Sequence, residues 1–497
     1  MTINIFADAL RGTSTCKKTE NGANAFSTTE NAIVDLFATI GAMRNGNNSM
    51  DRIKKMIDAA YAEDPLLLAK ILFYARDVRG GLGERYVFRE AIFYCADKYP
   101  GIVKKNIRLI PEYGRWDDMF ALMGTSLEED MWAVIISQLE EDTRNAELRK
   151  EISLCAKWMP SADTSSAQTR ELAKVCARHL GMNTYTYKRY IRNLRKHLKL
   201  LETDMSKKNW KEIDYEAIPS QAHMRHVKAF YRNDEERYKG YIENVKAGKA
   251  DIKASTLYPY EIVERLQRPG WDHNGHNDPY ETMWKNLPDY VGEGDNILVI
   301  ADTSGSMSGR PMATSVSLAI YFAERNKGAF EGMYMTFSQT PQIFQIDMTK
   351  SLAERYFAIY NGPWGGNTDL GRAMDLILHV AEHTHCRPED MPKSIVVITD
   401  MEIDSCESEG SAMWNTIIDE KRKAFRAKGF ELPNVVFWNV ASRHDTYLAR
   451  CNWKGVQLVS GSSASVFKSV LGYLNGMTPL DAVRKTLDVE RYAPITI

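Results

Sequence analysis

Ile297-Leu298-Val299-Ile300-Ala301-Asp302-Thr303-Ser304-Gly305-Ser306-Met307 is the stretch of sequence that decides the fold. Its first five residues are wholly apolar, which is typical of a central parallel strand that is buried on both faces. A carboxylate and two hydroxyls at alternate positions follow, and residues 311–326 then have the pattern of a helix. We therefore expect this loop at the carboxyl edge of an open α/β sheet, where such folds bind their ligands.

Strand and helix patterns alternate through the rest of this region, after Gly294. Further strands are predicted at residues 333–337, 343–346, 394–399, 435–438 and 456–459, and further helices at residues 369–381 and 464–474. Strands separated by helices predict a doubly wound sheet with helices on both faces. We expect this domain to span residues 291–476.

The first 290 residues differ, because their apolar periodicity is almost entirely helical. Asp64 and Pro65 form a good helix start, and the helix they open ends before Gly80 and Gly81. Further helices are predicted at residues 52–62, 86–99, 103–110, 130–142, 148–157, 168–180, 186–201 and 219–232. Many such helices joined by short turns predict a stacked array of HEAT-like helical repeats, although the sequence has no clear period. Residues 267–288, rich in Pro, Gly and Asn, have the composition of a connecting segment.

The composition is that of a large globular protein. The chain has 497 residues, with 64 Lys and Arg against 65 Asp and Glu, and a formal net charge of -1. It contains no run of about 18 apolar residues, so we expect no membrane span. Its start lacks the pattern of a signal peptide, and its seven cysteines form no CxxC pair. These features predict a cytoplasmic protein with free thiols.

Oxygen-bearing side chains stand at three places that a parallel sheet brings to one edge. Asp302, Ser304 and Ser306 follow the first strand, Thr368 follows a glycine-rich loop, and Asp400 ends the strand at residues 394–399. Hard oxygen ligands without His or Cys suit Mg²⁺, and also Mn²⁺ or Ca²⁺.

If the hydroxyls bind the ion directly and the carboxylates act through water, the ion keeps positive character and attracts an acidic side chain or a phosphate. A simpler alternative is that Asp302 and the two serines only cap a helix. A cap does not require Thr368 and Asp400 at matching edges. No nucleophile, acid–base pair or cofactor motif stands out, so we expect no enzyme activity.

The five oxygen-bearing residues resemble the metal-ion-dependent adhesion site of von Willebrand factor A domains. They stand in the same order and at the corresponding strand ends. The resemblance implies that residues 291–476 form a von Willebrand factor A domain, which has a Rossmann-like fold.

The chain as a whole is similar to the TROVE proteins, the family of the Ro autoantigen, and specifically to their plant, fungal, bacterial and phage relatives. The similarity lies in residues 76–85, 113–118, 156–160, 195–198, 234–238 and 437–439. In Ro proteins a von Willebrand A domain closes a ring of helical repeats, and the ring binds ends of misfolded RNAs and small structured RNAs. The resemblance implies a TROVE-like helical domain over residues 1–290, a ring and RNA as partner.

A basic segment offers a surface for that partner. Residues 185–199 contain six basic side chains and no acidic one. On a helix, Lys188, Arg192, Arg195 and Lys199 share one face that would suit phosphates, and Tyr185, Tyr187 and Tyr190 could stack on bases. The alternative is a solvated helix face with tyrosines in the core.

Three functions follow from these patterns. The first is a non-catalytic, Ro-like RNA-binding scaffold with a divalent-metal adhesion site, and we expect it to be monomeric. The second is a protein-interaction module whose metal grips an acidic residue of a partner. The third is a structural component of a larger assembly, such as that of a phage.

The tail at residues 477–497 is too short for a domain and too apolar for a free end. Thr478 and Pro479 start a helix well, and Leu480, Val483 and Leu487 form an apolar stripe at helical spacing. The resemblance to Ro-like rings implies that this tail returns to the helical domain. The alternative is that it folds locally against the helix predicted at residues 464–474.

Overall fold

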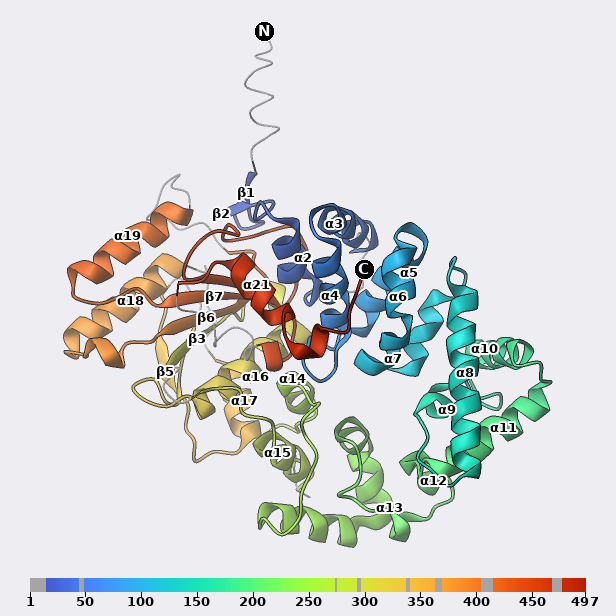
Figure 1. Cartoon of the computed structure of the whole chain (residues 1–497). Coiled ribbons are helices and arrows are strands. Elements are labelled where there is room, and N and C mark those ends of the chain that lie inside the picture. Colours follow the sequence, from blue (N-terminus) through green and yellow to red (C-terminus); the bar gives the residue numbers. More distant parts are fainter. Residues whose placement is uncertain are drawn as a thin grey trace. The chain divides into compact units, whose positions relative to one another are not determined.

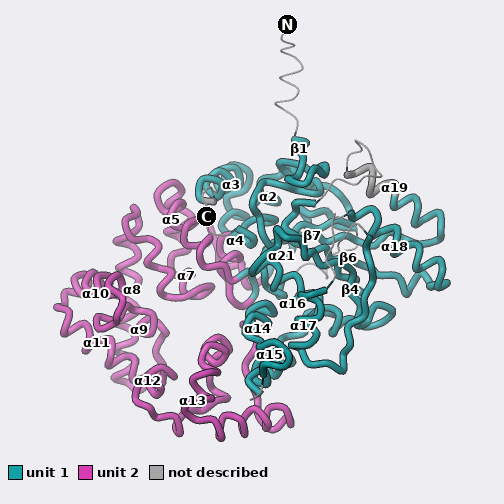
Figure 2. Tube along the Cα trace, turned by 180° about the vertical axis from the view of Figure 1, so that it is seen from behind, with its two compact units in different colours: residues 1–71, 80–82, 257–489 teal, residues 72–79, 83–256, 490–497 magenta. Residues whose placement is uncertain are grey.

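The computed structural model shows a mixed α/β protein with many helices and one large sheet (Figure 1). It describes residues 15–43, 49–272, 275–292, 296–336, 340–362, 369–403, 414–466 and 476–497, without the side chains of residues 49 and 414–420. Two compact units divide the chain (Figure 2). Unit 1 comprises residues 1–71, 80–82 and 257–489, and unit 2 comprises residues 72–79, 83–256 and 490–497.

Unit 1 contains the predicted sheet, which has six strands in the order β5-β4-β3-β6-β7-β8. The strands are β3 (Ile297–Ala301), β4 (Met333–Thr336), β5 (Ile343–Gln345), β6 (Ser394–Thr399), β7 (Asn434–Asn439) and β8 (Val456–Ser460). All neighbours are parallel except β4 and β5. Every residue of β3, β6 and β8 is buried, and for β3 this is the burial on both faces that its apolar run predicts.

Helices cover the sheet on both faces. The chain passes from β3 to β4 through α16 (Arg310–Arg325), and from β6 to β7, in the opposite direction, through α19 (Trp414–Ala427). Parallel crossovers are right-handed in nearly all proteins, so two crossovers in opposite directions put their helices on opposite faces, as in the predicted doubly wound architecture. α18 (Leu370–His383) packs beside α19, while α14 (Pro259–Val263) and α17 (Leu352–Tyr360) pack with α16, and α15 (Asp278–Lys285) packs against α14.

The N-terminal residues belong to the sheet unit and not to the helical one. Strands β1 (Cys16–Lys18) and β2 (Asn24–Phe26) form a hairpin that the helical patterns of this half did not predict. Phe26 and Tyr447 exchange two backbone hydrogen bonds of 2.9 and 3.0 Å. The predicted domain boundary at residue 290 therefore does not separate the two units, because residues 1–71 complete unit 1.

Helix α2 (Ala32–Ile40) fixes this attachment by packing against β8. Apolar side chains such as Ile33, Leu36 and Ile40 are wholly buried, and each contributes about 1.5–3 kcal/mol of stability. At its end, a Cβ on Gly41 would lie 2.7 Å from the carbonyl oxygen of Ser460. Only glycine allows this close approach of helix and strand. Helices α3 (Ser49–Glu63) and α4 (Pro65–Arg76) follow, α4 close to the predicted residues 64–75.

Unit 2 is built from helices throughout its described part. They are α5 (Arg85–Lys98), α6 (Pro100–Asn106), α7 (Ile110–Tyr113), α8 (Glu128–Glu147), α9 (Cys155–Trp158), α10 (Ala167–His179), α11 (Thr184–His197), α12 (Leu201–Ser206) and α13 (Ser220–Lys246), with short 3₁₀ turns between some of them. α13 runs beyond the predicted residues 219–232 and bends at Asp234, whose backbone is not helical. The HEAT-like character of this array stays a prediction.

The helix predicted at residues 148–157 is largely wrong. Arg149 has a positive φ of 56°, which ends α8, and only α9 is helical in this stretch. Buried Asp142 accepts hydrogen bonds from the backbone nitrogen and the hydroxyl of Ser153, at 2.8 and 2.7 Å. These bonds hold an extended connection where apolar periodicity alone predicts a helix.

A buried ionic cluster organises the first helices of unit 2. The carboxylate of Asp118 is wholly buried and lies 2.7 Å from the Nε atoms of both Arg76 and Arg89. It also accepts the backbone N–H of Arg115 at 2.9 Å. A Cβ on Gly114 would lie 2.5 Å from the same carboxylate, so the segment at residues 113–118 is built to hold this charge.

The C-terminal tail contributes to both units. α21 (Pro479–Leu487) starts with the predicted Thr478 cap and packs against α2 and β8 in unit 1. Residues 490–497 belong to unit 2, where the guanidinium of Arg491 pairs with buried Asp77 and Thr496 bonds twice with Asn106. The alternative prediction, that the tail folds against a helix at residues 464–474, depends on residues 467–474, which lie outside the described residues. Closure of the chain into a ring stays a prediction.

No helix in the described part of the chain has both the length and the apolar content needed to cross a membrane.

Candidate functional site

The carboxyl ends of β3 and β6 form the topological switch point of the sheet. These two strands are neighbours, and the chain leaves β3 toward β4 but leaves β6 toward β7. Loops that diverge in this way open a crevice at the strand ends, which is where open α/β folds bind ligands. Asp302 directly follows β3 and Asp400 directly follows β6. The strand order thus places both predicted carboxylates at the switch point.

Asp302 is held firmly at this edge. It is 2 % exposed, and its two carboxylate oxygens accept hydrogen bonds from the backbone N–H of Ser304 at 2.9 Å and from the hydroxyl of Thr399 at 2.7 Å. Burial, and then the negative charge of Asp400, raise the pKa of Asp302 to about 6. Two carboxylates are therefore packed close together where little water screens their repulsion.

The two predicted serines lie beside Asp302. Ser304 and Ser306 belong to the loop that enters a short 3₁₀ turn (Gly305–Met307), and their hydroxyl oxygens lie 3.0 Å apart. The structure thus brings Asp302, Ser304 and Ser306 together, with Asp400 on the neighbouring strand. Thr368, the fifth predicted residue, lies outside the described residues.

Asp400 has partners that the sequence patterns did not identify. It is 2 % exposed, and its Oδ2 lies 2.9 Å from the Nη2 atom of Arg443, in the loop after β7. The same nitrogen lies 3.0 Å from Glu20 of the β1–β2 hairpin. Arg443 and Glu20 come from distant segments that carry no motif, so only the folded chain reveals them.

A divalent cation fits this donor set. Asp302, Asp400 and the two serine hydroxyls supply oxygen only, which suits Mg²⁺, Mn²⁺ or Ca²⁺. Burial, and then the charge of Asp400, raise the pKa of Asp302, and a cation bound here would offset both by favouring the carboxylate form. No group of three or more His, Cys, Asp or Glu side chains within the described ranges could hold a metal by itself, so any site here depends on the hydroxyls.

The basic residues predicted to contact RNA are used in different ways. Lys188 pairs with Asp163 at 2.8 Å, whereas Arg192 is exposed on α11. Lys199 lies beyond the end of the helix, with a φ of 44°. The face that helical spacing predicts is therefore shared by residues 188, 192 and 195 only.

Arg195 holds the chain after α9. Its guanidinium donates to the carbonyls of Ala156 at 2.9 Å and Met159 at 2.6 Å, and to the hydroxyl of Ser161 at 2.8 Å. These bonds leave it little capacity for a phosphate. Arg195 therefore positions the loop at residues 156–161.

Two of the three tyrosines proposed to stack on bases are engaged inside unit 2. Tyr187 is buried and donates to the carbonyl of Pro160 at 2.8 Å, and Tyr190 donates to the carbonyl of Leu139 at 2.9 Å. The expectation that Tyr187 stacks on a base is therefore wrong, because its ring is buried in unit 2, whereas Tyr190 is half-buried and only its hydroxyl is engaged. Tyr185 is 73 % exposed and stays available.

A basic pocket of about 700 Å³ lies along α11 and α12. Its lining contains seven basic and two acidic side chains: Lys157, Lys188, Arg192, Arg195, Lys196, Lys207 and Arg225, with Asp163 and Glu202. Trp158 also lines it, with the guanidinium of Arg115 stacked 4.1 Å from the centre of its indole ring. Four of the seven cations lie outside the predicted set: Lys196 is on α11 itself, whereas Lys157, Lys207 and Arg225 come from separate segments.

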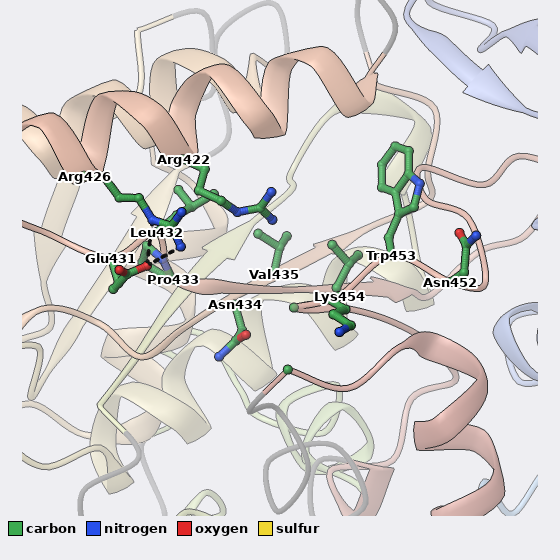
Figure 3. Close-up of a pocket in the computed structure, with 13 residues that line it drawn as sticks. Arg422, Arg426, Glu431, Leu432, Pro433, Asn434, Val435, Asn452, Trp453 and Lys454 are labelled. Carbon is green, nitrogen blue, oxygen red and sulfur yellow. Dashed lines mark hydrogen bonds and ion pairs between the residues drawn. The ribbon is translucent and has the colours of Figure 1, made fainter.

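A second pocket, of about 620 Å³, lies at the opposite, amino edge of the sheet (Figure 3). Arg422, Arg426 and Lys454 line it, beside Asn434 at the start of β7. The side chain of Arg426 is 61 % exposed and pairs with Glu431 at 3.4 Å. This pocket is an open surface hollow that lacks the buried, convergent groups of the carboxyl edge.

The protein thus has two parts. One is built on a mostly parallel α/β sheet with oxygen-bearing side chains at its switch point. The other is a helical unit with a basic pocket. The chain belongs to the DUF2828 family, a domain of unknown function whose model matches residues 19–135 and 118–291, more than half of its length. A second domain of unknown function, DUF7788, matches residues 296–490. An uncharacterized protein of Acanthamoeba polyphaga mimivirus is 26% identical over 496 residues, covering 91% of this chain and 84% of the viral protein.

Proposed function

We propose that this protein is a non-catalytic RNA-binding scaffold of the Ro-like, TROVE type. In this proposal unit 2 binds RNA, and the sheet of unit 1 is a von Willebrand A-like domain with a divalent-cation site. The observation that carries the proposal is the basic pocket of unit 2. The resemblance of its sequence segments to TROVE proteins supports the same function.

The pocket suits a single-stranded nucleic acid. Seven cations face two carboxylates in its lining, so its potential is positive and attracts phosphates. Arg192 and Lys196 are exposed on α11, and half-buried Trp158 offers an aromatic ring at the same place. Cations for the backbone beside an aromatic ring for a base are the usual means of binding single strands without strong sequence preference.

The test compares two double variants in a fluorescence anisotropy titration with a labelled single-stranded RNA. Arg192→Ala/Lys196→Ala should lower the affinity and reduce the slope of log K against log salt by about one unit per lost phosphate contact. The matched control, Lys239→Ala/Lys246→Ala, removes two lysines of α13 and should leave both unchanged. Equal affinity and equal slope in the two variants would contradict the proposal.

A second candidate function rests on the carboxyl edge of the sheet. Asp302, Ser304, Ser306 and Asp400 would hold a Mg²⁺, Mn²⁺ or Ca²⁺ ion, whose open position would take a Glu or Asp of a partner protein. The clustering of two buried carboxylates beside two hydroxyls favours it.

This function predicts a partner that is captured from lysate in Mg²⁺ but not in EDTA. Capture should be lost in Asp302→Ala and kept in Asp375→Ala, which removes an exposed carboxylate of α18 in the same unit. Capture by Asp302→Ala equal to that of the unmodified protein would count against a metal-dependent partner.

A further inference from the structure

The carboxyl edge of the sheet carries a cation of its own. Arg443 lies in the loop after β7, and one of its nitrogens, Nη2, lies 2.9 Å from Asp400 and 3.0 Å from Glu20. Its side chain is 42 % exposed, as is 43 % of that of Glu20, whereas the side chain of Asp400 is almost wholly buried. One guanidinium thus joins a predicted metal-site residue to the β1–β2 hairpin.

The turn of the hairpin is docked at this edge by two hydrogen bonds besides the Arg443 contact. The backbone N–H of Glu20 donates to the carboxylate of Glu402 at 2.7 Å, and the hydroxyl of Thr19 donates to the carbonyl of Ile403 at 2.6 Å. The carboxylate of Glu20 also pairs with His444 at 2.6 Å. Glu20 is therefore held whether or not Arg443 contacts it, while Arg443 has two competing anionic partners.

We propose that Arg443 is a partner-switching counter-ion. When no metal is bound it neutralises Asp400. When a divalent cation occupies the edge, the cation takes over that role and Arg443 pairs with Glu20 alone. The inference rests on the proposed metal site and adds that metal binding and hairpin docking are coupled through one guanidinium.

The coupling has a definite sign. Arg443 opposes metal binding, because its charge repels the ion and occupies Asp400. Glu20 favours metal binding, because Arg443 can still pair with Glu20 when the metal takes its place at Asp400. By linkage, a bound metal must strengthen the contact between Glu20 and Arg443, and so hold the hairpin more tightly.

Calorimetric titration of the full chain with MgCl₂ tests the first step. Arg443→Ala should bind Mg²⁺ about five- to tenfold more tightly than the unmodified protein. Arg443→Lys keeps the charge without the planar group and should lie between them. The matched control is Arg426→Ala, an arginine paired with a glutamate at the other edge of the sheet, and it should leave the affinity unchanged.

A double-mutant cycle separates partner switching from simple loss of charge. Glu20→Gln should weaken Mg²⁺ binding in the unmodified background, but much less in the Arg443→Ala background, where no arginine remains to be held. An equal effect in both backgrounds would mean that Glu20 acts on the ion directly, and would overturn the inference.

Limited trypsin digestion reads the hairpin without measuring metal affinity. Mg²⁺ should slow cleavage after Lys17 and Lys18 in the unmodified protein, and should not slow it in Arg443→Ala. If Arg443→Ala binds Mg²⁺ with unchanged affinity, the inference is wrong, although the proposed metal site is still supported. Absence of Mg²⁺ binding in both the unmodified protein and Arg443→Ala refutes the metal site and the inference together, whereas binding only in Arg443→Ala supports both.

Discussion

Two sets of charged residues stand out in the sequence, and the two units use them differently. In unit 1 the carboxylates of Asp302 and Asp400 lie close together, and burial, followed by the charge of Asp400, raises the pKa of Asp302. In unit 2 the basic face of α11 is partly absorbed by the fold, since Arg195 binds backbone carbonyls and Lys188 binds Asp163. A charged group that lowers the stability of the fold is a stronger sign of a binding site than a charged group that raises this stability.

The largest expected effect is on a carboxylate that serves only folding. Asp118→Asn should destabilise unit 2 by about 3–5 kcal/mol, because Arg76 and Arg89 would be left without their buried counter-charge. Urea unfolding followed by circular dichroism measures this loss. Asp375→Asn, at an exposed carboxylate, is the control and should unfold at the same urea concentration as the unmodified protein.

The next test separates two arginines of the same helix. Arg195→Ala should cost about 2–3 kcal/mol, because several carbonyl groups around residues 156–161 lose their donor. Arg192→Ala should leave the unfolding free energy unchanged while lowering RNA affinity. If Arg192→Ala also destabilised the protein, α11 would lack the division between structural and exposed cations that we describe.

Acid should act on unit 2 through His223. Burial lowers the pKa of this histidine to about 3, so the unfolded chain binds a proton that the folded chain does not. Stability is therefore full above the unfolded pKa of about 6.5 and falls by at most about 1.4 kcal/mol per pH unit from there toward pH 3. Thermal unfolding from pH 7 to pH 4 should show a smaller loss in His223→Gln. The control is His197→Gln, an exposed histidine of α11. An equal change in that variant would mean that the acid sensitivity does not come from His223.

The smallest effect is expected at the candidate metal site. Without divalent ions, Asp302→Asn should change the unfolding free energy by less than about 1 kcal/mol, because the substitution removes a carboxylate that burial and Asp400 disfavour. Mg²⁺ should raise the unfolding temperature of the unmodified protein and not that of the variant. A loss as large as that expected for Asp118→Asn would show that Asp302 is a folding residue, and would remove the contrast between the units.

The two matched domain models, DUF2828 and DUF7788, divide the chain differently from the compact units. Their matches meet near residue 290, whereas the compact units join residues 1–71 to the sheet. Sequence domains and packing units therefore differ in this protein.

Local pattern was enough for much of the fold and of the sheet-edge site. The apolar runs at residues 297–301 and 395–398 predict β3 and β6, because a strand buried on both faces is mostly apolar. The residue that follows such a strand lies at the carboxyl edge whatever the rest of the chain does. For that reason Asp302 and Asp400 could be placed at the same edge of the sheet from sequence alone, while the pairing of β3 with β6 makes them neighbours.

Only the tertiary structure decided how the distant segments are used. The β1–β2 hairpin, α2 and Arg443 join unit 1 through contacts between residues some 400 positions apart, and no periodicity encodes such a pairing. The basic pocket likewise draws its cations from α9, α11, α13 and the segments between them. The spacing of charges along a helix shows which of them share a face. It does not show which side chains pair with them, because hydrogen bonds and ion pairs form between neighbours in space and not in sequence.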